Sequence, residues 1–139
     1  MIVRLTQELY EYLIVYCDSR MPDEACGLIV GKQDETGIEA EAFIPVRNSS
    51  RQPRQHFEMA PDELIPALAQ AAGRLVGLFH SHPAAPPVPS EEDLQTLWHE
   101  VPSYWIVSFE TRSIPLLGIY QMKKTTSEPL RPIQWRISQ

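Results

Sequence analysis

The chain has 139 residues, a formal net charge of −6 and 43% hydrophobic residues, which suit a single folded domain over residues 1–139 rather than a disordered chain. The acidic balance argues against a nucleic-acid or anionic-membrane surface, and two cysteines are too few for a disulfide framework or a thiolate zinc site. We find no signal peptide and no apolar run of about 20 residues, so we expect a cytoplasmic protein with no membrane segment.

Taken in chain order, the first half alternates strands and helices. Residues 2–4 form a strand candidate, and a helix follows with Thr6 as its cap and apolar residues at helical spacing, namely Leu9, Leu13, Tyr16 and Cys17. Pro22 ends that helix or follows it closely. Residues 25–30 and 38–46 are expected to pair as strands, and residues 47–57 to form a loop without apolar periodicity.

The second half begins with a helix and then runs mainly into strands. Pro61 suits the first turn of a helix to about residue 72, in which Pro66 introduces a kink. Residues 74–79 are a strand, 90–98 a short helix, and 104–109, 115–120 and 133–137 further strands. This order favours an α/β layered domain with a mixed sheet.

The run HSHPAAPPVPSEED, residues 80–93, carries the chemistry. Residues i and i+2 of a strand point to the same side, so His80 and His82 can present two imidazoles to one point. Asp93 could supply a third ligand from the far side of a loop that several prolines stiffen. Two histidines and one carboxylate, with an open fourth position, are typical of a hydrolytic Zn2+ site.

The same residues have a purely structural interpretation. Ser90 and Asp93 have the spacing of a helix N-terminus, where Ser90 would act as the cap and Asp93 would interact favourably with the helix dipole. The two interpretations are compatible, because one short helix can aim both side chains inward.

A metal-activated water also needs a base. Ser81 occupies the place between the histidines where some metalloproteases keep theirs, so the base must come from elsewhere. Glu24, just ahead of the apolar segment 25–30, is the best candidate, and Asp23 is a weaker alternative.

Together, P-x-E-A-C-G (residues 22–27), H-S-H-P (80–83) and S-x-x-D (90–93) resemble the signature of the JAMM/MPN+ zinc metallopeptidase family. The resemblance implies a mixed curved sheet flanked by helices, similar to the cytidine deaminases, in the compact prokaryotic type of the family. It implies that His80, His82 and Asp93 hold Zn2+, that Glu24 is the general base, and that Ser90 donates a hydrogen bond to the oxyanion.

The substrate that the resemblance implies is the C-terminal tail of a ubiquitin-like or sulfur-carrier protein, cut at an amide or isopeptide bond. The alternative is a non-catalytic MPN-like module that binds partner proteins, although such modules usually lack the metal ligands. A zinc deaminase is the least favoured, since its H-x-E and P-C-x-x-C motifs are absent. The sequence leaves the oligomeric state open, a homodimer included.

Other chemically notable residues receive structural interpretations. Cys26 is expected to be a buried small hydrophobe rather than a nucleophile. The arginines of the 47–57 loop are expected to be solvated, His56 and His99 to be surface or structural, and the three tryptophans to belong to the core: Trp98, Trp105 and Trp135.

Overall fold

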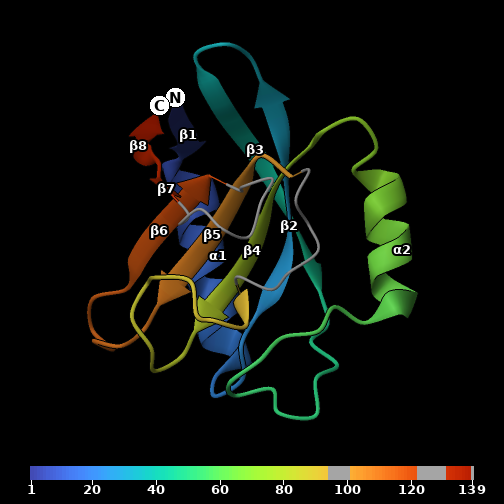
Figure 1. Cartoon of the computed structure of the whole chain (residues 1–139), viewed down its shortest axis with the longest axis vertical. Helices are drawn as coiled ribbons and strands as arrows, with labels where there is room; N and C mark the ends of the chain where they lie inside the picture. Colours follow the sequence, from blue (N-terminus) through green and yellow to red (C-terminus); the bar gives the residue numbers. More distant parts are fainter. Residues whose placement is uncertain (94–100, 122–130, 139) are drawn as a thin grey trace.

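The computed structural model describes residues 1–93, 101–121 and 131–138. Ten elements follow one another along this part of the chain (Figure 1). They are β1 (Ile2–Thr6), α1 (Gln7–Arg20), β2 (Cys26–Gln33), β3 (Gly37–Val46), α2 (Pro61–Gln70), β4 (Leu75–His82), β5 (Ser103–Ser108), β6 (Leu116–Gln121), β7 (Arg131–Pro132) and β8 (Gln134–Ser138).

The strands form one mixed sheet in the order β7-β6-β5-β4-β2-β3-β1-β8. β4 pairs antiparallel with β2 and parallel with β5, so the centre of the sheet joins distant parts of the sequence. The two edge strands, β7 and β8, are separated in the chain by Ile133 alone. The edges of the sheet therefore lie close together, and the sheet curls almost into a barrel.

The helices cover different faces of the sheet, as Figure 1 shows for α1 and α2. On α1, Thr6 Oγ1 accepts a hydrogen bond from the Leu9 amide at 3.1 Å, which confirms the predicted cap. The buried side of α1 contributes Leu9, Leu13 and Cys17 to the larger core cluster. α2 contributes Ala67, and its C-cap residue Ala71 joins it, in a second cluster on the other face.

Most of the predicted elements are confirmed, with boundaries shifted by one to three residues. β4 extends through His82, so both histidines lie on the strand itself and not after it. Helix α2 ends at Gln70 and keeps Pro66 inside it. The short strand β7 was not predicted, and residues 94–98 of the predicted helix at 90–98 lie outside the described residues.

None of the described helices is long and apolar enough to cross a membrane.

Candidate metal centre

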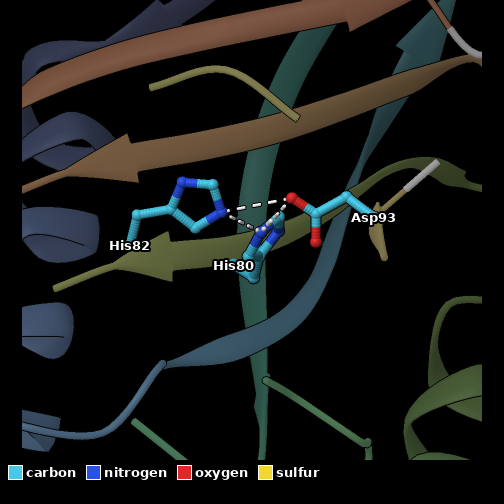
Figure 2. Close-up of side chains that lie close together, drawn as sticks. All are labelled: His80, His82 and Asp93. Carbon is cyan, nitrogen blue, oxygen red and sulfur yellow. Dashed lines mark hydrogen bonds and ion pairs between the residues drawn. The ribbon is translucent and has the colours of Figure 1, made fainter. Parts of the chain in front are cut away.

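The side chains of His80, His82 and Asp93 meet at one point, although the proline-rich segment 83–89 separates Asp93 from the histidines in the chain (Figure 2). His80 and His82 project from the same face of β4, and Asp93 approaches them from the other side. The two histidine Nε2 atoms are 2.9 Å apart, and Asp93 Oδ2 lies 3.3 Å from that of His80 and 3.2 Å from that of His82. All three residues are buried. The structure thus brings together the three residues predicted as ligands.

This triangle fits a metal ion in both its dimensions and its chemistry. Zinc ligands at 2.0–2.1 Å in a tetrahedron stand about 3.3 Å apart, which matches the separations of the three atoms. His82 Nδ1 donates to the Pro86 carbonyl at 2.8 Å, so in the neutral imidazole Nε2 carries a lone pair. Lone pairs of His82 Nε2 and the Asp93 carboxylate facing each other at 3.2 Å require a cation or a proton between them. The donor set is therefore compatible with a metal ion.

The protonation states of His80 and Asp93 suit the same use. Burial lowers the pKa of His80, although Asp93 opposes this effect, so His80 is held neutral. Burial would raise the pKa of Asp93, but its hydrogen bonds with the two histidines and with the Ser90 amide outweigh burial and lower it well below its usual range. A neutral imidazole and an ionised carboxylate are the forms that bind a divalent cation.

Ser90 aims Asp93 through a reciprocal pair of hydrogen bonds. The Ser90 amide donates to Asp93 Oδ2 at 2.8 Å, and the Asp93 amide donates to Ser90 Oγ at 3.1 Å. This is the predicted capping arrangement, and it holds the carboxylate oxygen that faces the histidines. Because Ser90 Oγ accepts that bond through its oxygen, its hydroxyl proton is free to donate to another group.

Glu24 is buried next to the three ligands, in the position set by the pairing of β2 with β4. In the antiparallel pairing of β2 with β4, Cys26 stands opposite His80, so Glu24, two residues earlier, comes level with His82 on the same face. Burial raises the pKa of Glu24 to about 8, and Asp93 adds to this while His82 opposes it. Asp23, the weaker alternative, is half-buried.

The profile of the Prok-JAB family, prokaryotic homologs of the JAB domain, matches residues 6–116. The chain belongs to this family. The matched segment contains Glu24, both histidines, Ser90 and Asp93, so the predicted resemblance is confirmed at the level of the family.

Relatives and solved structures agree with this assignment. Desampylases of Pyrococcus furiosus and Haloferax volcanii are 38% and 37% identical over 89 and 75 residues, which are 60% and 52% of this chain. The tail tip assembly protein K of Escherichia phage N15 is 32% identical over 89 residues, which are 64% of this chain. The matches span 58%, 52% and 34% of these three relatives, respectively.

The solution structure of DSY2949 from Desulfitobacterium hafniense has a TM-score of 0.85 and 29% identity, covering 99% of this chain and 93% of that one. The JAB1/MPN domain protein AF2198 from Archaeoglobus fulgidus has a TM-score of 0.61 at 19% identity and covers 99% and 97%. The predicted α/β fold of MPN type is thereby confirmed.

Ser81, between the two histidines, holds the segment that carries Glu24. Its amide donates to the Ala25 carbonyl at 2.9 Å, and its Oγ accepts from the Ala25 amide at 2.8 Å. Both backbone groups of the residue after Glu24 are thus bound to β4. In the sequence, Ser81 is notable only for standing where some metalloproteases keep a base, and no pattern predicts its buried, fixed position.

The 47–58 loop also contacts the site, which its sequence did not predict. Phe57 stacks on the His80 ring with centroids 4.6 Å apart, and the His56 side chain contacts that of Glu92, next to Asp93. Among the arginines of this loop, Arg47 is exposed, as predicted, and it also pairs with the exposed Asp62 at 2.9 Å.

The other structural interpretations are confirmed where the chain is described. Cys26 is buried, and burial raises the pKa of its thiol to about 12, which leaves no thiolate to act as a nucleophile. Trp105 is fully buried, and Trp135 packs against the core. His99 and Trp98 lie outside the described residues.

Proposed function

We propose that this protein is a zinc-dependent hydrolase that cleaves an amide or isopeptide bond at the C-terminal tail of a ubiquitin-like or sulfur-carrier protein. The observation that carries the proposal is the buried triangle of His80, His82 and Asp93 with a buried carboxylic acid, Glu24, beside it. The names of the two archaeal relatives, both desampylases, support a ubiquitin-like substrate.

In this proposal His80, His82 and Asp93 hold Zn2+, which would polarise the scissile carbonyl and lower the pKa of the attacking water. Glu24 takes a proton from that water during attack and gives it to the departing amine. Burial raises the pKa of Glu24, and a cation held by the three ligands would lower it again, which would leave a carboxylate free to act as the base. The Ser90 hydroxyl donates a hydrogen bond to the carbonyl oxygen as negative charge develops there.

The test uses the purified protein and a ubiquitin-like modifier from the same genome whose C-terminal glycine is linked to a fluorogenic amine. We expect cleavage with one Zn2+ per chain, loss of cleavage in chelator, and recovery when Zn2+ is restored. Glu24→Gln should lower kcat by about 10²–10⁴-fold while the protein still binds zinc. Asp23→Asn, the matched loss of a neighbouring acid, should retain activity and would exclude Asp23 as the base.

A protein that binds no zinc, or a Glu24→Gln variant as active as wild type, would refute the mechanism. A protein that binds the modifier in the presence of zinc but never cleaves it would favour the non-catalytic binding module instead.

A further inference from the structure

Asn48 lies at the neck of the 47–58 loop and uses both ends of its side-chain amide. Its Oδ1 accepts hydrogen bonds from the amides of Ser50 and Glu58, each at 3.0 Å. Its Nδ2 donates to the His56 carbonyl at 2.9 Å. An asparagine amide can serve two acceptors and two donors at once, and a loop closed on itself in this way has one fixed shape.

The same side chain ties the loop to Glu24. Asn48 Nδ2 also donates to the Glu24 carbonyl at 3.0 Å, and the Glu24 amide donates to the Pro53 carbonyl at 2.7 Å. Both backbone groups of Glu24 are therefore bound by this one loop. On the following residue, Ala25, both backbone groups are bound by Ser81 of β4. Glu24 is thus fixed between the loop and the strand that carries the histidines.

The far end of the loop reaches the metal ligands. Phe57 stacks on the His80 ring, against which Tyr104 and His82 also pack. His80 Nδ1 has no hydrogen-bond partner among the described residues, so packing contacts such as that with Phe57 help to fix the ring. His56, whose carbonyl Asn48 binds, pairs with Glu92 beside Asp93. One loop thus contacts Glu24, His80 and the turn that carries Asp93.

We infer that Asn48 is a positioning residue for the reaction: by closing the 47–58 loop and binding the Glu24 carbonyl, it sets the position of Glu24 relative to the three ligands. The inference rests on the proposed function for its effect on catalysis, but its structural part concerns only contacts within this chain. Among the described residues, the side-chain hydrogen bonds of Asn48 go to backbone groups of other residues and to none of the three ligands. Its effect is exerted through Glu24, Phe57 and His56.

The decisive variant is Asn48→Asp, which keeps an acceptor for the Ser50 and Glu58 amides but has no N–H to donate to the Glu24 and His56 carbonyls. Asn48→Ser is a second variant that removes the reach of the side chain without adding charge. The matched control is Ser49→Ala, which removes a hydrogen bond of the same loop, from Ser49 Oγ to the Glu58 carbonyl at 3.1 Å, and makes no contact with Glu24.

Three measurements are made on the full chain: steady-state cleavage of the modifier conjugate, zinc affinity by competition with a chelator, and hydrogen exchange of the Glu24 amide. We expect Asn48→Asp and Asn48→Ser to lower kcat about 10- to 100-fold, with KM changed less than threefold, as for loss of a residue that orients catalytic groups. Exchange of the Glu24 amide should accelerate at least tenfold, and zinc should be held more weakly. Ser49→Ala should stay within twofold of wild type in all three.

The inference is overturned if the Asn48 variants match Ser49→Ala in kcat and in Glu24 exchange, or if Ser49→Ala loses as much as they do. Circular dichroism and thermal melting check that each variant folds at the assay temperature. If the wild-type protein cleaves no conjugate, the proposed function fails, and the exchange and zinc measurements still decide whether Asn48 holds Glu24 in place.

Discussion

Glu24→Gln should make the metal-free protein more stable near neutral pH even though it removes the proposed base. The pKa of Glu24 rises from 4.5 to about 8 on folding, chiefly because burial disfavours the carboxylate. A raised pKa means that the folded state binds the proton more tightly than the unfolded chain. The contribution of Glu24 to stability is therefore full below pH 4.5 and is lost progressively as the pH rises through 8.

The size of the effect follows from the shift. Each pKa unit corresponds to about 1.4 kcal/mol, so the fold loses about 3 kcal/mol of stability by pH 7 and about 4 kcal/mol by pH 8, relative to pH 4. Glutamine has a similar shape and no charge to desolvate. The variant should therefore equal wild type within about 1 kcal/mol near pH 4 and exceed it by about 3 kcal/mol at pH 7 and about 4 kcal/mol at pH 8.

Urea unfolding in excess chelator at pH 4, 6, 7 and 8 measures this difference. With a slope of about 1–3 kcal/mol per molar urea, a gain of about 3 kcal/mol moves the midpoint by about 1–3 M. Asp23→Asn, which removes an acid at a half-buried neighbouring position, is the matched control for the loss of a nearby carboxyl group. Added zinc should shrink the difference, because a cation beside Glu24 favours its carboxylate.

A difference between wild type and variant that does not change with pH would refute this reasoning, as would a wild type that is the more stable of the two at pH 8. Either result would mean that Glu24 is not desolvated in the folded chain. Its assignment as a base of raised pKa would then lose its physical support.

Two further substitutions test the surroundings of the site. Ser81→Ala leaves the buried Ala25 amide without its acceptor and should lower the free energy of unfolding by about 1–3 kcal/mol, measured with urea. We expect the substitution to change kcat more than KM. An unchanged urea midpoint would contradict the role of this hydrogen bond. Gly118→Ala would place a Cβ 2.6 Å from the Pro87 carbonyl oxygen, so the proline-rich segment must shift. We expect the free energy of unfolding to fall by about 1–3 kcal/mol and zinc to bind more weakly. Unchanged zinc affinity would show that this contact does not position the ligands.

The sequence predicted the ligands because their geometry follows from local rules. Alternation along β4 places His80 and His82 on one face, and the S-x-x-D spacing turns Asp93 back toward them through its hydrogen bonds with Ser90. Glu24 was the best candidate for the base because it precedes an apolar strand, but its place beside His82 depends on the register between β2 and β4, which no local pattern encodes.

The parts that sequence reasoning missed act through backbone groups of residues distant in the chain. Asn48 binds the carbonyl of Glu24, 24 positions away, and Ser81 binds the amide of Ala25, 56 positions away. The residue types of Glu24 and Ala25 do not identify them as partners, because every residue has a backbone carbonyl and every residue except proline has a backbone N–H. Only the fold shows which of them is close enough to bind.

Hydrogen bonds from distant residues to backbone groups also fix the proline-rich segment between His82 and Asp93, which the sequence motif alone does not position. Its prolines lack amide donors, and its carbonyls are instead bound from neighbouring strands: Ser108 Oγ donates to Ala85 and the Tyr120 hydroxyl to Pro87, each at 2.6 Å, while the Phe109 amide donates to His82 at 3.0 Å. β5 and β6 therefore hold the segment between His82 and Asp93 in one conformation. These hydrogen bonds help to set the separation of the ligands, so Ser108→Ala and Tyr120→Phe should weaken zinc binding, measured by competition with a chelator, although neither residue is a ligand.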